Sequence, residues 1–171
     1  MPLVVLNGAS GAGKTTIAEA IERAYGDAIE VFFMDRAGVP SPAEMVDRFG
    51  SGEAWQEAVT FDWMTRLSPL VADGRAVIFE GQTRFSFLAE AMEKTGIERA
   101  TCILVDCDDD TRQRRLSVDR KQPELANADM RNWARFLRRQ AVAYGHPILD
   151  TSALSLEDSV AYVLGLLRGD A

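Results

Sequence analysis

Short apolar runs alternate with amphipathic segments along this chain. Five apolar stretches predict buried strands, at residues 3–6, 29–34, 76–79, 100–105 and 147–149. Between them, apolar positions spaced three or four residues apart predict helices, at residues 13–25, 53–72, 85–94, 129–143 and 155–168, with shorter ones at 43–49 and 110–118. Apolar strands that alternate with helices are typical of a parallel sheet covered on both faces. We therefore expect an α/β fold with three layers, α/β/α, around a five-stranded parallel sheet.

Proline and glycine mark the interruptions of this pattern. Residues 38–42 must form a loop, Pro69 is expected to disturb the end of its helix, and Pro123 lies in a break over residues 119–127. None of these stretches is long enough to separate two domains, and 171 residues are a usual length for one. We expect a single domain over residues 1–171.

The first strand leads into a glycine-rich segment, which carries the clearest chemical signal of the chain. Residues 8–15 (GASGAGKT) fit G-x-x-x-x-G-K-[ST] between a strand and a helix, as a phosphate-binding loop requires. Backbone amides of this loop surround phosphates, and the helix N-terminus adds a favourable dipole. We assign nucleotide binding to Gly8, Ala9, Ser10, Gly11, Ala12, Gly13, Lys14 and Thr15. Lys14 would reach the β- and γ-phosphates and Thr15 would hold Mg²⁺, whereas Thr16 either touches the α-phosphate or only starts the helix.

Charge is unevenly distributed over the chain. The net charge is −7, yet residues 111–140 contain nine basic residues against three acidic ones. An acidic protein is a poor general binder of nucleic acid, whereas a local basic cluster suits a small polyanion. We therefore expect a small-molecule ligand and no nucleic-acid partner.

Other residue types exclude several classes of protein. Cys102, Cys107 and the single histidine, His146, match no zinc or redox spacing. No apolar run has the length of a membrane span, and a strand pattern follows Met1 where a signal peptide would need its apolar core. These features favour a cytoplasmic protein; the oligomeric state is not encoded in any pattern we identify.

Several motifs resemble those of small P-loop kinases, the group of adenylate, shikimate and gluconate kinases and chloramphenicol phosphotransferase. The opening residues 5–14 (VLNGASGAGK) resemble the phosphotransferase, and residues 80–84 (EGQTR) are similar to the D-G-x-P-R of adenylate kinases. Arg115 with residues 123–125 (PEL) resembles the adenine-stacking arginine and the lid of shikimate kinases, although Gln122 replaces the lid arginine. The resemblance implies the P-loop NTPase fold and a mobile lid around residues 116–130. It also implies an adenine site flanked by Ser152 and the closing strand.

The same resemblance suggests roles for polar residues at the carboxyl ends of the strands, where ligands bind in open α/β sheets. Asp35 would bind or deprotonate the acceptor hydroxyl, Glu80 would orient Mg²⁺-bound water, and Arg84 would contact the transferred phosphoryl group or the acceptor. Each has a plainer interpretation: Asp35 as a loop cap, Glu80 as a solvated or capping acid, and Arg84 as a surface charge. Arg120, like Lys121, could substitute for the lid arginine, and Arg36 either recognises an anion or is a surface arginine.

Two further sets of residues could belong either to the site or to the rest of the fold. The arginines at 131, 135, 138 and 139 are typical of a solvated helix face, although Arg135 and Arg139 could reach the cleft. The aromatic residues Trp55, Phe61, Trp63 and Trp133 either belong to the core or line an acceptor pocket.

These features together predict an ATP- and Mg²⁺-dependent kinase that phosphorylates a hydroxyl of a sugar, an alcohol or an antibiotic-like molecule. Lys14, Asp35, Arg84 and Arg120 are its expected catalytic residues. A nucleoside or nucleotide kinase and a non-catalytic ATP-binding switch are the alternatives. Residues 151–153 (TSA) weakly resemble the guanine loop of GTPases, but the N-K-x-D motif is absent. A motor or AAA+ module would usually be longer and would need further motifs.

Overall fold

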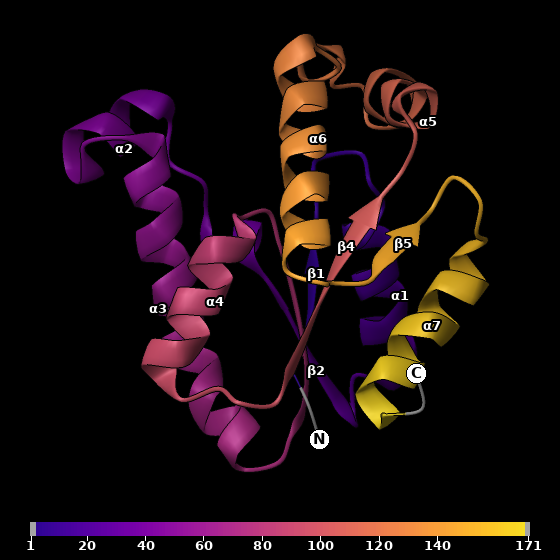
Figure 1. Ribbon diagram of the computed structural model, residues 1–171. Helices are drawn as coiled ribbons and strands as arrows, with labels where there is room; N and C mark the ends of the chain where they lie inside the picture. Colours follow the sequence, from indigo (N-terminus) through magenta and orange to yellow (C-terminus); the bar gives the residue numbers. More distant parts are fainter. Residues whose placement is uncertain (1–2, 170–171) are drawn as a thin grey trace.

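A computed structural model describes residues 3–169 of the chain, which form a parallel sheet flanked by helices (Figure 1). The sheet has five strands in the order β2-β3-β1-β4-β5. The strands are β1 (Leu3–Asn7), β2 (Ile29–Phe33), β3 (Ala76–Gly81), β4 (Ala100–Asp106) and β5 (Ile148–Asp150). All strand pairs are parallel, with β1 between β3 and β4 at the centre. The expected three-layer α/β/α fold is confirmed.

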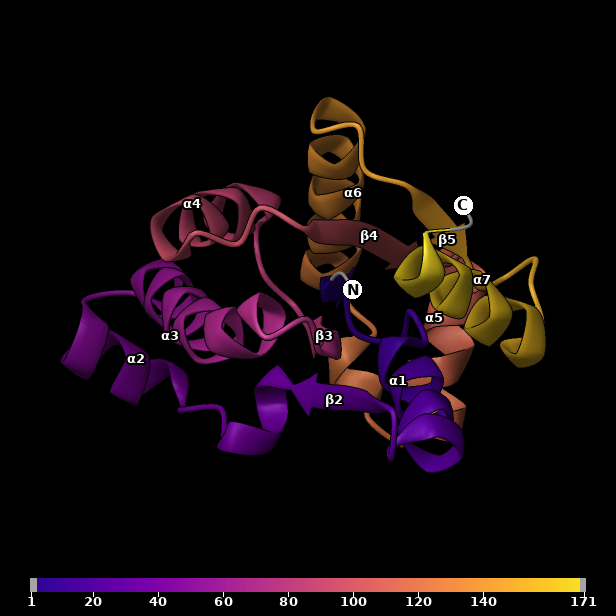
Figure 2. The ribbon, with the colours of Figure 1, turned by 90° about the horizontal axis from the view of Figure 1, so that it is seen from below.

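Helices cover both faces of the sheet (Figure 2). They are α1 (Lys14–Tyr25), α2 (Pro42–Phe49), α3 (Gly52–Ala72), α4 (Phe85–Thr95), α5 (Asp109–Arg114), α6 (Ala128–Ala143) and α7 (Leu156–Arg168). One core packs α3, α4 and α6 against alternate residues of the strands, and the other packs α1 and α7 against the opposite face. The central strand β1 is buried along its whole length, as its unbroken apolar pattern predicts.

Local signals explain where several helices begin. The Ser41 side chain accepts a hydrogen bond from the Glu44 amide and the Glu44 side chain returns to Ser41, a complete capping box for α2. Ser155 caps α7 by accepting from the Asp158 amide. These caps satisfy backbone donors that have no partner within the helix.

The structure differs from the sequence-based expectations in a few segments. Helix α3 continues through Pro69 to Ala72, although the proline has no amide that could donate to the Thr65 carbonyl oxygen. The helix expected over 110–118 is α-helical only to Arg114 and continues as a π-helical turn over Arg115–Asp119. Strand β3 runs two residues further than predicted and includes Glu80 and Gly81.

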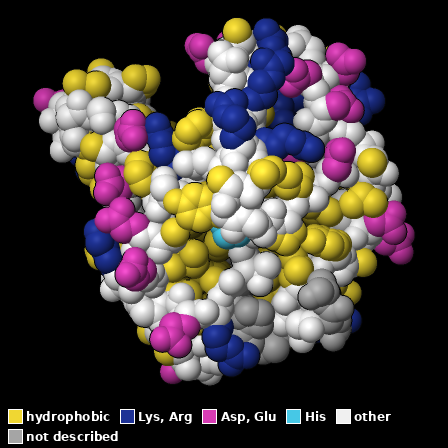
Figure 3. Space-filling model, in the orientation of Figure 1, with side chains coloured by type: hydrophobic (Ala, Val, Ile, Leu, Met, Phe, Trp, Pro, Cys, Tyr) yellow, Lys and Arg dark blue, Asp and Glu magenta, His cyan; other side chains and the backbone are white. Residues whose placement is uncertain are grey.

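The carboxyl ends of the strands meet at one edge of the sheet, where the phosphate-binding loop also lies. A 3₁₀ turn (Met34–Ala37) follows β2 at this edge, and another (Pro123–Leu125) precedes α6. Figure 3 shows the molecule hollowed between α2 and α6, with basic side chains along α6. Among residues 3–169, no helix combines the length and apolarity that crossing a membrane requires.

Candidate active site

Glycines allow the loop between β1 and α1 to approach its neighbours closely. A Cβ on Gly8 would lie 2.2 Å from the Val105 carbonyl oxygen, so no larger residue fits there without moving β4. Gly11 and Gly13 have φ of +80° and +95°, a left-handed region that side chains disfavour. The segment at residues 8–15 therefore has the conformation that its glycines predict. It lies between β1 and α1, as a phosphate-binding loop requires.

Lys14 and Glu80 form a buried pair at the bottom of the site. Their side chains lie 3.5 Å apart, and Lys14 Nζ also donates to the Ala9 carbonyl oxygen at 3.3 Å. Thr15 Oγ1 donates to Glu80 Oε1 at 3.3 Å, so the acid contacts both polar side chains of the motif. Glu80 is 5% exposed and therefore is not the solvated acid of the plainer interpretation.

Charged groups from several segments act on the pKa of Lys14. Burial lowers the pKa of Lys14, while the carboxylates of Glu80 and Asp35 raise it and the Arg120 cation lowers it. Asp35 is exposed in the turn after β2, and Arg120 is exposed just after the π-helical turn. The charges that act on Lys14 therefore come from both the turn after β2 and the segment before α6.

A cavity of about 380 Å³ adjoins the phosphate-binding loop on the α7 side. Its lining includes Lys14, Thr15, Thr16, Arg115 and Arg120, together with residues that begin α7 and precede it. Arg115 is fixed at its edge: it donates to the Thr151 side chain at 2.8 Å, to the Thr151 carbonyl oxygen at 2.9 Å and to the Gly11 carbonyl oxygen at 3.3 Å. The arginine therefore joins the loop after β5 to the phosphate-binding loop.

The donor set of this site fits a nucleotide and Mg²⁺. The left-handed glycines leave a cradle without side chains, Lys14 lies at its base, and Thr15 Oγ1 and the Glu80 carboxylate are the oxygen ligands that Mg²⁺ prefers. Thr15 would be a direct ligand, and Glu80 would hold a water of the ion. Within residues 3–169, no group of three His, Cys, Asp or Glu side chains forms a separate metal site.

Arg84 lies on the other side of the cleft, at the start of α4. It donates to Gln56 Oε1 at 3.1 Å and pairs with Glu53 at 3.0 Å, both on α3. The rings of Phe87, Trp133 and Phe136 surround its guanidinium group, with centroids 5.3–5.5 Å away. Its side chain is only 24% exposed, which argues against a simple surface charge.

A buried hydrogen-bond network connects this side of the cleft to the end of β1. Asn7 Nδ2 donates to the Thr83 carbonyl oxygen at 2.8 Å and Asn7 Oδ1 accepts from the Thr83 amide at 2.9 Å. The hydroxyls of Thr83 and Thr60 lie 2.8 Å apart. Ser10 Oγ donates to Gln82 Oε1 at 3.2 Å, and so joins the phosphate-binding loop to the same segment. Sequence reasoning missed Gln56 and Thr60, since a polar residue on a helix carries no signal of a partner far along the chain.

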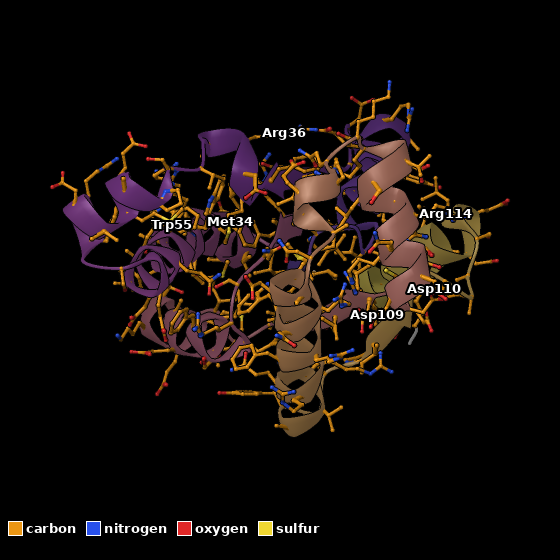
Figure 4. All side chains as sticks on the ribbon, turned by 90° about the horizontal axis from the view of Figure 1, so that it is seen from above. Met34, Arg36, Trp55, Asp109, Asp110 and Arg114 are labelled. Carbon is orange, nitrogen blue, oxygen red and sulfur yellow. The ribbon has the colours of Figure 1, made fainter. Side chains whose placement is uncertain are left out.

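The structure separates several other residues from the catalytic centre. Arg36 pairs with Glu19 and Glu22 of α1, at 3.3 and 3.2 Å, and stacks on Phe33, so it is a surface arginine (Figure 4). Ser152 is exposed and its hydroxyl accepts from the Asp108 amide at 2.7 Å. Arg135 pairs with Asp109 on α5 at 3.0 Å.

The aromatic residues and His146 lie in different surroundings. Trp63 belongs to the core, with its ring centroid 5.3 Å from that of Phe79, whereas Phe61 is 44% exposed and lines a cavity between α3 and α4. Of the four aromatic residues considered, Trp133 contacts Arg84 and Trp55 is half-buried near the start of α3. His146 lies against the rings of Phe85 and Tyr144.

Comparisons with known proteins agree with the fold. A family described as an AAA domain has a model that matches residues 4–139. Similar solved structures include a sugar kinase from Janibacter sp. HTCC2649, 18% identical, with a TM-score of 0.67 over 98% of this chain and 95% of that chain. A shikimate kinase from Acinetobacter baumannii in complex with shikimate is 16% identical, with a TM-score of 0.66 over 99% and 94%. A gluconokinase from Sinorhizobium meliloti 1021 is 16% identical, with a TM-score of 0.57 over 98% and 91%.

At such identities, the solved structures establish a shared fold, and a comparison with curated proteins finds no match. The family description is broader than the group of small P-loop kinases that the sequence resembles. On sequence alone an AAA+ module is not expected, because such a module would usually be longer and would need further motifs. The match nevertheless spans the phosphate-binding loop, β3 with Glu80 and most of α6. The chain therefore belongs to this AAA-domain family and has the three-layer fold of the small P-loop kinases.

Proposed function

We propose that the protein is a kinase that transfers the γ-phosphoryl group of ATP to a hydroxyl group of a small molecule. The carrying observation is the phosphate-binding loop itself, in which the buried Lys14 pairs with Glu80 beside a cavity that Arg120 also lines. Phosphoryl transfer uses cations near the phosphates and a carboxylate that acts on the acceptor, and we assign the second role to Asp35 in the turn after β2.

Each of these residues has a role in the proposed reaction. Lys14 and Arg120 bind the oxygens of the transferred group and stabilise the charge that develops on them. Asp35 binds the acceptor hydroxyl and receives its proton, while the acceptor oxygen forms the new bond to phosphorus and ADP leaves with the electrons of the broken bond. Bound Mg²⁺ would neutralise phosphate charge, with Thr15 and Glu80 holding it.

The nucleotide occupies the cavity between the phosphate-binding loop and α7 in this proposal. Arg115 and the loop with Ser152 flank the adenine, and Thr16 contacts the α-phosphate. Residues 116–130 act as a lid that brings Arg120 onto the phosphates and excludes water. The π-helical turn at Arg115–Asp119 supports a lid, because such turns often occur at functional sites. The proposed enzyme is a single domain over residues 1–171, and its need for ATP fits a cytoplasmic location.

The acceptor occupies the side of the cleft between the turn after β2, the start of α3 and the start of α4. Asp35 contacts the reacting hydroxyl, and Arg84 contacts another polar group of the acceptor. The fold shared with kinases of shikimate, gluconate and sugars supports a small polyhydroxylated acceptor.

The test is an ADP-release assay with MgATP over separate panels of sugars, polyols, hydroxy acids, aminoglycoside-like antibiotics and nucleosides. Acceptor-stimulated ADP release and a phosphorylated product detected by mass spectrometry would support the proposal. Phosphorylation of nucleosides alone would favour a nucleoside kinase. Nucleotide binding that changes affinity for a protein partner, without any phosphorylated product, would favour a switch and contradict the proposed activity.

A further inference from the structure

Arg112 on α5 is a buried arginine that holds the phosphate-binding loop from below. It is 2% exposed, and its Nη1 donates to the Ser10 carbonyl oxygen at 2.9 Å. Its Nη2 donates to Asp106 Oδ1 at 2.6 Å and to the Cys107 carbonyl oxygen at 3.2 Å. One guanidinium group therefore contacts the loop, the end of β4 and the segment that follows β4.

Asp106 extends this contact to α6. The carboxylate is 6% exposed, and its second oxygen accepts from Arg138 Nη1 at 2.8 Å. Helix α6 also provides the rings of Trp133 and Phe136 around Arg84, and Gln140 Oε1 accepts from the Phe85 amide at 2.9 Å. The contacts from Ser10 to Arg138 consequently connect the nucleotide side of the cleft to the helix that lines its acceptor side.

The contacts among Arg112, Asp106 and Arg138 indicate that Arg112 positions its partners rather than adding much to the stability of the fold. A buried ion pair contributes little net stability, because desolvation offsets the attraction between the charges. Arg112 Nε is buried and has no acceptor within the described part of the chain, which adds a cost to folding. The planar fork of the guanidinium group, in contrast, fixes the relative positions of its oxygen partners.

We propose that Arg112 is a positioning residue that orients the Ser10–Gly11 peptide of the phosphate-binding loop for phosphate binding, with Asp106 fixing the arginine in turn. In a planar trans peptide the carbonyl oxygen and the following N–H point in opposite directions. Holding the Ser10 carbonyl oxygen therefore fixes the direction of the Gly11 N–H, and Gly11 lines the nucleotide cavity. This inference rests on the proposed nucleotide site but not on the identity of the acceptor.

The chain offers matched variants to test this role. Arg112→Lys keeps the charge but replaces the fork with a single ammonium group, which cannot span the three oxygen partners. Asp106→Asn keeps the shape and removes the buried negative charge. Arg135→Gln is the control, because it removes an arginine from an exposed ion pair between α6 and α5 that does not involve the loop.

The measurements are the Kd for MgADP by calorimetry and amide exchange without nucleotide. Arg112→Lys should weaken MgADP binding about tenfold, which corresponds to one charge-assisted hydrogen bond. Asp106→Asn should weaken it about threefold, and Arg135→Gln should change it less than about twofold. Amide exchange should accelerate in residues 8–13 of Arg112→Lys and stay unchanged in β1 and β4. A purely structural role would instead accelerate exchange across the strands as well.

Two outcomes would overturn the inference. One is a folded Arg112→Lys variant that binds MgADP within about twofold of wild type and keeps wild-type exchange in residues 8–13. If that variant does not fold, unchanged MgADP affinity in Asp106→Asn overturns the inference instead. Failure of the proposed function has a different signature, because wild-type protein would then bind MgADP without phosphorylating any acceptor, or would bind no nucleotide at all.

Discussion

On the nucleotide side of the cleft, three charged side chains next to the phosphate-binding loop are buried, and each has partners within the fold. Lys14, Glu80 and Arg112 are all less than 7% exposed, and each contacts the phosphate-binding loop directly or forms part of it. On the acceptor side, Asp35 is exposed and the Glu53 side chain that pairs with Arg84 is 60% exposed. The first side is fixed by the core, whereas the second is held by a short turn and the exposed beginning of α3.

This contrast has a physical origin in the two substrates that we propose. A phosphate-binding loop needs several amides in one fixed arrangement, so its surroundings must be rigid. The acceptor pocket that we propose would instead use the turn after β2, the start of α3 and the start of α4, which are far apart along the chain. Such a pocket can change its specificity through surface substitutions that leave the core intact.

The largest expected effect tests the nucleotide side. Lys14→Ala should reduce ATP turnover by roughly 10²–10³-fold, because a buried cation that stabilises developing charge is lost. Lys94→Ala is the matched control, since Lys94 is an exposed lysine on α4 that pairs with Glu90. Steady-state ADP release measures both variants. Equal turnover in Lys14→Ala and wild type would remove the basis for a catalytic phosphate-binding loop.

The next effect tests whether the two sides act in one reaction. Asp35→Asn should lower kcat by roughly 10²-fold or more and change the Kd for MgATP little, because the base acts on the acceptor and not on the nucleotide. Asp47→Asn changes another exposed aspartate, on α2, and should leave both constants near wild type. If Asp35→Asn has a wild-type kcat, then Asp35 only caps the turn after β2.

A smaller effect concerns acceptor specificity. Arg84→Met should raise the acceptor KM about tenfold and leave nucleotide affinity unchanged, because one charge-assisted hydrogen bond to the acceptor is lost. Arg66→Met is a matched control, since Arg66 also pairs with an acid and lies over a tryptophan ring, but on the outer part of α3. A change in MgATP affinity in Arg84→Met, with an unchanged acceptor KM, would place Arg84 on the nucleotide side.

The same contrast explains what the sequence could predict. The alternation of apolar runs with amphipathic segments is a local signal, and so is the motif at residues 8–15. The sheet, the helices and the phosphate-binding loop could therefore be predicted from them. Glu80 was also predictable, because it directly follows an apolar strand. The partners of Arg112 were not, since Asp106 and Ser10 meet it only through packing of α5 against the loop. The surroundings of Arg84 depend on α3, α4 and α6 together, and no spacing within one segment encodes them.

The smallest expected effect is the pH dependence of nucleotide binding. Burial lowers the pKa of Lys14, so this cation loses its proton at a lower pH than an ordinary lysine. Phosphate binds the cationic form and raises that pKa again. MgATP affinity should therefore be constant below the lowered pKa, fall above it, and be accompanied by proton uptake in the falling range. Calorimetry in buffers of different ionisation enthalpy measures this uptake.

The Cys107 thiol is a second titratable group in contact with the phosphate-binding loop. It lies 3.6 Å from the Gly11 carbonyl oxygen, and burial raises its pKa. Cys107→Ser removes that titration and keeps a hydrogen-bond donor, so the variant should show the same fall in affinity as wild type. Loss of the pH dependence in Cys107→Ser would assign the effect to the thiol. An affinity that stays constant to high pH, without proton uptake, would mean that Lys14 keeps its charge when the nucleotide is absent and that the paired carboxylates outweigh its burial.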